Sequence, residues 1–350
     1  MVKRVAFGIS GDYAQLTGGY AYDRRVIEEL RGIGWDADFL DVGSGYPRPD
    51  TATLATTRQQ LASVPSGTPL LIDGLVYGLI PEIVADLQLS HPLIALVHHP
   101  LALETGWSRA DAARLLNSER DALACARAVI ATSVTTERIL VESYGVPRGR
   151  ITVALPGTDR FQAARGSHAD SVSLLSVGAI VPRKGHDLLV AALATLTDLP
   201  WNLIIAGDPD RSAEMLRQLK ADIAHFGLGD RVVLAGGVSH ERLAELYDGA
   251  DLFVLASHYE GYGMAYTEAL AHGLPVIGTT GGAIPEAVPH GAGLLVPPGD
   301  VPALAAALRR LIASPDERRR FSAAARKAAQ NFPTWSDAAA RVARAIEAVI

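Results

Sequence analysis

Cysteine and long apolar runs are scarce in this 350-residue chain. The single cysteine, Cys125, cannot form an intramolecular disulfide, which excludes a disulfide-stapled module and indicates a reducing environment. Its helical surroundings predict a small core residue. No uncharged apolar run reaches the ~18 residues that a membrane-spanning helix needs, so any membrane contact is expected to be peripheral. The apolar part of residues 1–9 is too short for a signal peptide, and none is expected.

An excess of positive charge is also missing. The chain has 32 Lys and Arg against 38 Asp and Glu, a net charge of −6, and no strongly basic segment. Nucleic acid is therefore not an expected partner. Hydrophobic residues make up 49% of the chain and charged residues 20%, which excludes intrinsic disorder and predicts a globular protein. At this length, two domains or one large α/β unit are expected.

What the chain does have is a regular alternation of short β-branched runs with longer helical patterns. This alternation is typical of parallel sheets covered by helices. About twelve such runs are present, against the eight strands of a TIM barrel, so an α/β fold of two doubly wound parallel sheets is predicted. The expected strands are residues 2–9, 36–42, 70–73, 93–98, 128–132, 151–155, 173–177, 202–206, 232–235, 252–255, 276–278 and 293–296.

The stretch Phe161–Asp170 is polar, rich in small residues and without apolar periodicity, and it predicts a linker. We therefore expect an N-terminal domain over 1–165 and a C-terminal domain over 166–332, with a hinge near Gly166. Residues 333–350 are expected to form a helix that packs back towards the N-terminal domain. A cleft between two such lobes, at the carboxyl ends of the strands, is the default ligand site in this architecture.

The strongest local signal is EGYGMAYTE, which follows an apolar strand and opens a helix. Its glycines let a ligand approach backbone N–H groups at the positive end of that helix, which suits phosphate. Its two carboxylates can each accept paired hydrogen bonds from sugar hydroxyls. Alternatively, the first carboxylate only favours the helix dipole and the second is solvated. The candidate donor-binding residues of this segment are Glu260, Gly261, Tyr262, Gly263, Met264 and Glu268.

A second segment, GAIVPRKG at residues 178–185, joins a strand to a helix. Arg183 and Lys184 stand at the start of that helix, where the dipole disfavours cations. Two adjacent cations there make more sense if an anion binds to them. The segment is not a Walker A loop, because no Gly-Lys-Ser/Thr follows at the required spacing. A solvated basic pair at a turn is the alternative.

Two features of the first half complete the candidate site. The loop Ser10–Tyr20 carries Gly18 and Gly19 just before a helix, and a glycine pair brings backbone donors close to a phosphate or a sugar. It lacks G-x-G-x-x-G, which argues against a nicotinamide oxidoreductase. In LVHHP, His98 directly follows a strand, and its imidazole is a candidate to hydrogen-bond a sugar, with a structural histidine at a strand end as the alternative.

No metal site is expected. The segment Asp208-Pro209-Asp210 has the D-x-D form of a metal motif, but a proline between two aspartates after a strand is typical of a turn. No cluster of histidine, cysteine and aspartate with zinc spacing accompanies His98. The expected cofactor list is therefore empty, and a nucleotide-diphosphate sugar would be a co-substrate.

Taken together, these motifs resemble the retaining glycosyltransferases of family 4, which belong to the glycosyl transferases group 1 and have the GT-B fold. The resemblance covers nearly the whole chain. Its most specific part is the run from Ser257 to Thr279, with E-x7-E inside it. Further matches are TGGYAYDRRV at residues 17–26, LVHHP at 96–100, LPGTD at 155–159 and VGAIVPRKGHDLL at 177–189.

The resemblance implies a role for each matching residue. In that family the E-x7-E glutamates bind the nucleotide sugar, so Glu260 would contact the donor sugar and Glu268 the ribose. Arg183 and Lys184 would bind the diphosphate. In the other lobe, the glycine pair would be Gly18 and Gly19, and the sugar-contacting histidine would be His98. Family members often carry an arginine where this chain has Ala179, a position for which Arg183 is the expected substitute. The TTGGAIPE turn, with Gly281 and Gly282, also matches.

The function implied is metal-independent, retaining transfer of a hexose from a UDP- or GDP-linked sugar to a glycan, lipid-linked or small-molecule acceptor. Same-face attack, with the leaving phosphate receiving the acceptor proton, is the mechanism implied. The alternatives are a catalytically silent nucleotide-sugar-binding protein of the same fold and a sugar epimerase, which the fold alone does not separate. Family analogy further implies polysaccharide or cell-envelope glycan synthesis, with the protein cytoplasmic or peripheral at the inner membrane face.

Overall fold

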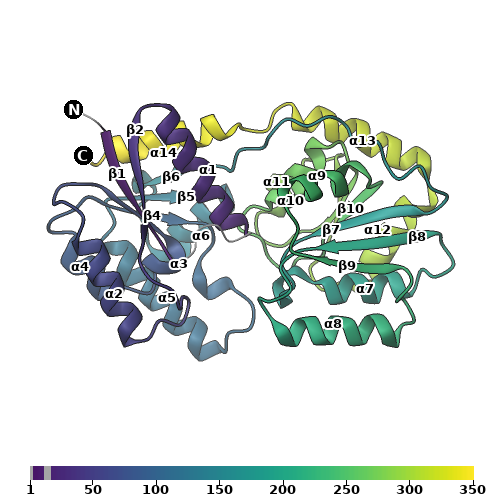
Figure 1. Ribbon diagram of the computed structural model, residues 1–350, viewed down its shortest axis with the longest axis horizontal. Helices are drawn as coiled ribbons and strands as arrows, with labels where there is room; N and C mark the ends of the chain where they lie inside the picture. The colour runs from purple at the N-terminus through teal and green to yellow at the C-terminus, as the bar shows by residue number, and fades with distance from the viewer. Residues whose placement is uncertain (1–2, 12–16) are drawn as a thin grey trace. The chain divides into compact units, whose positions relative to one another are not determined.

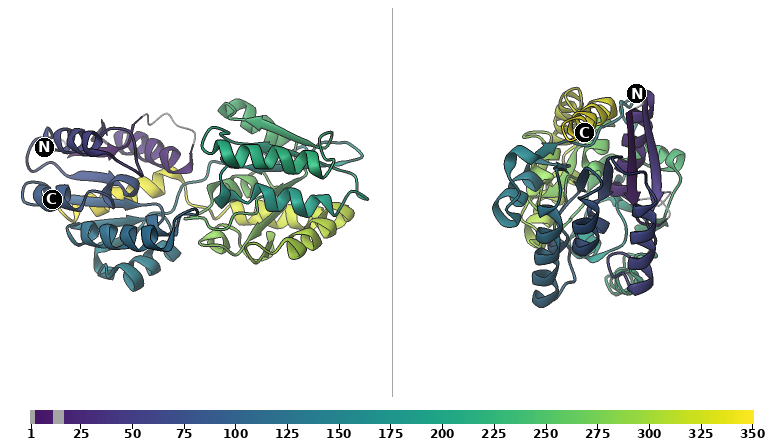
Figure 2. Two further views of the ribbon diagram at one scale, coloured as in Figure 1. Left: turned by 90° about the horizontal axis from the view of Figure 1, so that it is seen from below. Right: turned by 90° about the vertical axis from the view of Figure 1, so that its left-hand side faces the viewer.

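The computed structural model describes residues 3–11 and 17–350. Val2, where the first strand is expected to start, lies outside these ranges. The described chain forms two six-stranded parallel sheets with helices on both faces of each (Figures 1 and 2). The predicted α/β class with two doubly wound sheets is confirmed. Every expected strand is present, and its described ends lie within two residues of the prediction.

The first sheet has the strand order β2-β1-β3-β4-β5-β6. Its central strands are apolar and fully buried, as in β4, LIALV, because a parallel sheet is covered on both sides. One face packs on helices α2 to α6, and the other on α1 and α14. The strands are β1 Lys3–Ile9, β2 Trp35–Asp41, β3 Leu70–Asp73, β4 Leu93–Val97, β5 Ala128–Ala131 and β6 Ile151–Val153. The helices are α1 Gly18–Gly32, α2 Thr51–Ala62, α3 Gly74–Tyr77, α4 Pro81–Leu87, α5 Arg109–Ala124, α6 Val134–Tyr144 and α14 Trp335–Glu347, with short 3-10 turns η1 Leu101–Leu103 and η2 Arg148–Arg150.

The second sheet has the order β12-β11-β10-β7-β8-β9. Numbered from its own first strand this is the order 3-2-1-4-5-6 read from the other edge, the order of dinucleotide-binding folds. Helices α7, α8 and α12 cover one face, and α9, α10 and α13 cover the other. The strands are β7 Val172–Val177, β8 Trp201–Ala206, β9 Val232–Gly236, β10 Leu252–Val254, β11 Val276–Thr279 and β12 Gly293–Val296. The helices are α7 His186–Ala194, α8 Ala213–His225, α9 His240–Asp248, α10 Met264–Ala271, α11 Ile284–Ala287, α12 Val301–Ala313 and α13 Pro315–Ala329, with the 3-10 turn η3 Pro182–Lys184.

The sheets define two compact units. Unit 1 is Met1–Gly157 with Pro333–Ile350, and unit 2 is Thr158–Phe332. The boundary therefore falls eight residues before the expected position between 165 and 166. The reason is that the expected linker is bonded to unit 2: the amide of Ala164 donates to the carbonyl of His272 at 2.7 Å. The carboxylate of Asp251 likewise accepts from the Ser167 hydroxyl at 2.6 Å.

Gly166 is part of this anchored stretch rather than a hinge. Its amide donates to the carbonyl of Asp248 at 2.9 Å, and a Cβ there would lie 2.7 Å from Asp251 Oδ1. The chain passes between the units at Gly157 and again at Pro333. A Cβ on Gly157 would lie 2.3 Å from the amide nitrogen of Trp335, so the two passages touch each other within unit 1.

The last helix, α14, belongs to unit 1 and packs against α1, β5 and β6 (Figure 1). It begins with a capping box in which Thr334 and Asp337 bond each other's backbone amides. Its apolar stripe, with Val342 and Ile346 fully buried, closes the face of the sheet that α1 leaves open. Trp335, at its start, packs edge-on against Tyr22 of α1 at 5.9 Å.

No helix in the described parts of the chain has both the length and the apolar character needed to span a bilayer. Cys125 ends α5 and is partly buried against the unit 1 core, where it is a free cysteine. The segment Asp208–Asp210 forms the predicted turn, because the amide of Asp210 donates to the Asp208 carboxylate at 2.9 Å.

Candidate functional site

Each sheet has one place where the strand order reverses direction, and ligands of open α/β sheets bind outside the carboxyl ends of the strands at such a place. In unit 2 the reversal lies between β7 and β10. The loops that leave these two strands carry Arg183 and Lys184 on one side and Glu260 on the other. In unit 1 it lies between β1 and β3, and the next strand, β4, is followed directly by His98.

The unit 2 loops bring three of the predicted residues together. Lys184 Nζ donates to Glu260 Oε1 at 2.6 Å, and Arg183 Nη1 donates to Glu260 Oε2 at 3.0 Å. Ser257 Oγ also donates to Oε1, at 2.6 Å. Arg183 further donates to the Tyr259 carbonyl at 2.9 Å, which ties the two loops to each other. The basic pair is therefore largely enclosed, with side chains 15% and 16% exposed, and is not the solvated pair of the alternative interpretation.

The electrostatics of this cluster depend on one negative charge held between two positive ones. Burial raises the pKa of Glu260, but the charges of Lys184 and Arg183, with hydrogen bonds from Lys184 and Ser257, outweigh burial and lower that pKa to about 2. Glu260 is therefore a carboxylate at neutral pH. The three side chains together carry a net charge of +1, a surplus that favours an anionic ligand such as a diphosphate.

Glycines hold the Glu260 loop in place because no side chain would fit. Gly185 has φ +64°, and a Cβ there would lie 2.2 Å from the carbonyl oxygen of Ala256. On the other side, a Cβ on Gly281 would lie 2.2 Å from the His258 carbonyl, and one on Gly282 would lie 2.2 Å from the Glu260 carbonyl. The loop is thus pressed between two glycine turns, which fixes the carboxylate relative to Lys184.

Helix α10 starts directly after Glu260. Its N-cap is Gly263, at φ +102°, so no side chain occupies the amides of the first turn, and that turn contains no acidic residue. Gly261 and Gly263 stand next to Tyr262, which is 6% exposed, and Met264 is the first helical residue. The amides of this helix start are the predicted partners for phosphate.

Glu268 lies one turn further along α10, on its half-buried side. Tyr247 of α9 donates a hydrogen bond to its Oε2 at 3.1 Å. Burial raises the pKa of Glu268 to about 7, with the Tyr247 hydrogen bond opposing the rise. Tyr247 stacks on His272 at 4.8 Å, and His272 stacks on Phe161 at 4.1 Å. Glu268, the residue predicted to bind ribose, is therefore bonded to a tyrosine that belongs to a stack of three rings. The stack ends at Phe161, near the start of unit 2.

Sequence reasoning missed His186, whose ring contacts the first residue of the loop that carries Lys184. Its ring is fully buried, with Nε2 3.1 Å from the carbonyl oxygen of Gly178 and Nδ1 3.5 Å from Ser176 Oγ. Burial lowers its pKa to about 4, so the ring is neutral at neutral pH. The signal was a polar ring at the start of the most apolar helix of the unit, HDLLVAALA, where only a satisfied histidine is tolerated.

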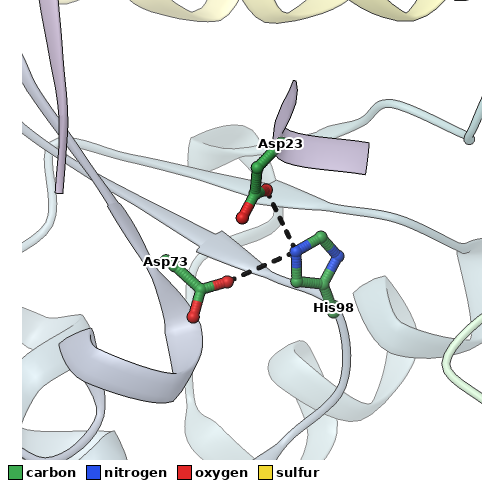
Figure 3. A group of neighbouring side chains, drawn as sticks. All are labelled: Asp23, Asp73 and His98. Atoms are coloured by element: carbon green, nitrogen blue, oxygen red, sulfur yellow. Dashed lines mark hydrogen bonds and ion pairs between the residues drawn. The ribbon is translucent and has the colours of Figure 1, made fainter. Parts of the chain in front are cut away.

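In unit 1 the structure places Gly18 and Gly19 in the first turn of α1, not before the helix as expected. Gly19 lies against the ring of His98: a Cβ on it would be 3.4 Å from His98 Cδ2. His98 follows β4 as predicted, and its Nε2 lies 3.2 Å from Asp23 Oδ1 and 3.3 Å from Asp73 Oδ2 (Figure 3). The predicted glycine and histidine therefore meet at one spot, together with two aspartates.

Asp23 and Asp73 were not singled out from the sequence. Asp73 is the last residue of β3, and Asp23 stands on the buried face of α1 between apolar residues; both are buried. A carboxylate on an apolar helix face was the available signal, since such a group is buried only with a partner. Burial lowers the pKa of His98, but Asp23 and Asp73 outweigh it and raise it to about 10. Burial raises the pKa of Asp23 to about 6, opposed by His98.

The same three donor atoms lie within 4.8 Å of one another, and two carboxylates with an imidazole are a donor set that divalent cations also accept. In the structure, His98 Nε2 is hydrogen-bonded to Asp23 Oδ1 at 3.2 Å and lies at ion-pair distance, 3.3 Å, from Asp73 Oδ2.

The loop after His98, residues 101–109, is packed into unit 1. Leu101 is buried, and its amide donates to the Glu119 carboxylate at 3.0 Å. Arg48 lies over the ring of Trp107 at 5.1 Å, which joins this loop to the one after β2. His99 Nε2 lies 3.3 Å from Glu104 Oε2. Leu103 alone among the apolar residues of the loop is exposed, at 38%.

Comparison with known proteins agrees with this arrangement. Residues 158–328 match the family model of the glycosyl transferases group 1, a span that coincides closely with unit 2. A D-inositol 3-phosphate glycosyltransferase of Thermobispora bispora is 34% identical over 72% of this chain, which spans 64% of that relative's length. An MMP alpha-(1->4)-mannosyltransferase of Mycolicibacterium hassiacum is 29% identical over 88% of this chain and 77% of its own.

Solved structures extend the likeness to both units. A sucrose-phosphate synthase from Thermosynechococcus elongatus superposes with a TM-score of 0.84 at 27% identity, covering 99% of this chain and 98% of its own. The Anabaena protein HepE, solved in complex with UDP-glucose, has the same fold, with a TM-score of 0.78 at 17% identity over 99% of both chains. The family match, the relatives and the shared fold together show that unit 2 of this chain is a domain of the glycosyl transferases group 1 family and that the chain has the GT-B fold.

Proposed function

We propose that the protein is a retaining, metal-independent glycosyltransferase that moves a hexose from a UDP- or GDP-linked sugar to an acceptor. The observation that carries the proposal is the cluster of Lys184, Arg183 and Glu260 beside the uncapped start of α10. Glycosyl transfer needs stabilisation of the charge that grows on the departing diphosphate. Two largely enclosed cations and an uncapped helix start supply it from fixed positions.

Each residue has a defined task in this proposal. The amides at Gly263 and Met264 and the side chain of Lys184 bind the diphosphate, with Arg183 taking the place of the arginine replaced by Ala179. Glu260 accepts hydrogen bonds from the hexose while it orients both cations. Glu268 accepts from the ribose hydroxyls, and Tyr247 keeps its carboxylate turned in that direction. The phosphate oxygen freed by departure of the hexose receives the acceptor proton, which gives retention.

A small-molecule acceptor is favoured over a glycan or a lipid-linked one. The relatives include a D-inositol 3-phosphate glycosyltransferase and a mannosylfructose-phosphate synthase, and the first of these matches over 72% of this chain. UDP is the first donor base to test, because HepE, which shares the fold, was solved with UDP-glucose. A cytoplasmic location, with any membrane contact peripheral, goes with soluble substrates of this kind.

The first experiment is calorimetric and thermal-shift binding of UDP, GDP and ADP without added metal. Wild type is compared with Lys184→Ala and with Lys220→Ala, which removes an exposed lysine from α8. We expect one diphosphate to stabilise wild type and Lys220→Ala, and binding to Lys184→Ala to be at least tenfold weaker. Equal binding to both variants would contradict the assigned site. Binding without transfer to any acceptor would instead favour a silent nucleotide-sugar-binding protein.

A further inference from the structure

Asp23 and Asp73, which we call the clamp on His98, have an arrangement that sugar contact alone does not explain. One ring nitrogen, Nε2, faces two carboxylates from different elements: Asp23 of α1 and Asp73 at the end of β3. These carboxylates are 1% and 8% exposed. An imidazole needs only one acceptor for one N–H. A second buried carboxylate on the same nitrogen is costly unless the ring carries a positive charge.

The surroundings leave the ring little room to turn. Tyr22 packs edge-on against it at 5.3 Å and 82°, and the Tyr22 hydroxyl is bonded to the carbonyl of Ala154 at 3.0 Å. The backbone of Gly19 lies against it from the helix side. The His98 carbonyl accepts from Thr132 Oγ1 at 3.1 Å, which fixes the chain at this residue. With Nε2 directed inward, Nδ1 points away from both carboxylates, as Figure 3 shows.

The neutral and the protonated ring of His98 give the cluster different net charges. Neutral His98 would leave two buried carboxylates with a net charge of −2 around a single N–H. Imidazolium reduces the net charge to −1, makes the hydrogen bond to Asp23 charge-assisted and turns the Asp73 contact into an ion pair. Arg24, next to Asp23 on α1, adds a further positive charge that favours the ionised form of that carboxylate. The geometry therefore selects the charged ring.

We propose that Asp23 and Asp73 are positioning residues that hold His98 as an imidazolium with Nε2–H turned inward, so that Nδ1–H is a fixed, charged donor for an oxygen of the bound sugar. The proposal rests on the proposed function for the identity of the ligand, but the state of the ring does not. A charged donor held in advance stabilises negative charge on a substrate oxygen without reorganisation during the reaction.

The test combines nitrogen-detected NMR with kinetics. Protein labelled with ¹⁵N-histidine contains 10 histidines, and His98→Gln assigns the resonance of interest. The variants are Asp23→Asn and Asp73→Asn, each of which keeps the shape of the side chain. Glu119→Gln is the matched control, because Glu119 is another buried carboxyl of unit 1 that bonds a backbone amide instead of a histidine. Thermal unfolding of every variant is measured alongside.

At pH 7.5, we expect both ring nitrogens of His98 to be protonated in wild type and in Glu119→Gln, and one of them to be deprotonated in most molecules of Asp73→Asn. With the donor found above, kcat should fall roughly tenfold in Asp23→Asn and Asp73→Asn while the donor KM changes less than twofold, the pattern of a group that acts in the transition state. A purely structural role would lower the unfolding temperature without moving the histidine resonance.

A neutral His98 in wild type would overturn the proposal. So would stoichiometric binding of Mn²⁺ or Zn²⁺ to wild type that is lost in Asp73→Asn, since the three residues would then be cation ligands. If the imidazolium is observed but no nucleoside diphosphate binds, the clamp stands and the proposed function fails. If a diphosphate binds and is used while His98 is neutral, the function stands and the clamp fails.

Discussion

The two units build their sites at the same place in the fold with opposite charge arrangements. In unit 2 one buried carboxylate, Glu260, lies between two cations, and the cluster is left with net positive charge. In unit 1 one imidazole, His98, lies between two carboxylates, and the cluster is left with net negative charge. Parallel sheets thus offer the same position in both units, while the side chains at the strand ends decide the sign of the charge there. A net positive cluster suits phosphate, and a net negative one suits groups that donate hydrogen bonds.

The units also differ in how tightly their backbones surround the site. The Glu260 loop is wedged between glycines where a Cβ would approach carbonyl oxygens to 2.2 Å. At His98 the nearest glycine leaves ordinary contact distance, 3.4 Å. Substitution of a glycine beside the Glu260 loop should therefore do more damage than substitution of Gly19 beside His98, and the predictions below begin with the Glu260 loop.

The largest effect is expected from Gly185→Ala. Its added Cβ would meet the Ala256 carbonyl at 2.2 Å in a left-handed backbone, so unit 2 should lose about 4 kcal/mol of unfolding free energy. Gly227→Ala is the control, because Gly227 has nearly the same φ, +66°, and open space around it. Only the left-handed strain, about 1 to 2 kcal/mol, applies there. Urea unfolding should distinguish the two variants. Equal losses of unfolding free energy would contradict the predicted clash at Gly185.

The second prediction concerns Glu260→Gln. Removing its charge leaves Lys184 and Arg183 more positive, so diphosphate affinity should stay the same or rise while kcat falls roughly a hundredfold. Lys184→Ala should do the reverse and weaken diphosphate binding first. Calorimetry with the nucleoside diphosphate and steady-state kinetics give the two numbers. A parallel loss of affinity in both variants would show that Glu260 does not act on the sugar.

The third prediction is that the stabilities of the two units depend on pH in opposite directions. The folded pKa of Glu260, about 2, lies below its ordinary value of 4.5, so its stabilisation is present above pH 4.5 and is lost as pH falls, about 3 kcal/mol in all. Burial raises the pKa of Glu119 to about 8, so ionising this carboxyl costs the folded state free energy as pH rises from 4.5 to 8. The pKa of His98 is raised to about 10, so the stabilisation from its charged ring is lost as pH rises from 6.5 to 10. Unit 2 should therefore weaken first in acid and unit 1 first in alkali.

Fluorotryptophan NMR can follow this difference, because the chain has four tryptophans and only Trp201 lies in unit 2. Urea titrations at pH 4, 7 and 9.5 give a separate midpoint for Trp201 and for the unit 1 resonances. A common midpoint that moves in one direction would refute the prediction.

The smallest effect is expected from Tyr247→Phe. Loss of its hydrogen bond to Glu268 should raise the pKa of that carboxyl further above 7, so nucleotide affinity at pH 7 should fall about threefold. The loss should shrink at pH 8.5, where the carboxyl is ionised with or without the tyrosine. A threefold loss that is independent of pH would point to the aromatic stack instead.

Much of the fold was readable from the sequence because strands of parallel sheets are continuous apolar runs. Arg183, Lys184 and Glu260 could be found as well, since each follows a strand by a short loop. The roles of these residues stay predictions, as do the family 4 assignment and the cleft between the units. Asp23 was missed: its place on an apolar helix face signals a buried carboxylate, but its partner is 75 residues away and helix periodicity does not report what a buried polar residue bonds to.

The domain boundary shows the same limit. The stretch Phe161–Asp170 has the composition of a linker, yet its amides and side chains bond to the α9–β10 corner and to His272. Composition reports which residues tolerate solvent, and it does not report which backbone groups find partners after folding. Gly157 carried no such polar signal, although the chain leaves unit 1 there.

The return of α14 to unit 1 sets an order of events during synthesis. Residues 333–350 emerge from the ribosome only after all of unit 2, yet they cover a face of the first sheet through Trp335 and Val342. Unit 2 is continuous in sequence and can complete its core as soon as it emerges, whereas unit 1, made first, waits with apolar β5 and β6 uncovered. The half of the molecule that is translated first is therefore the half that is finished last.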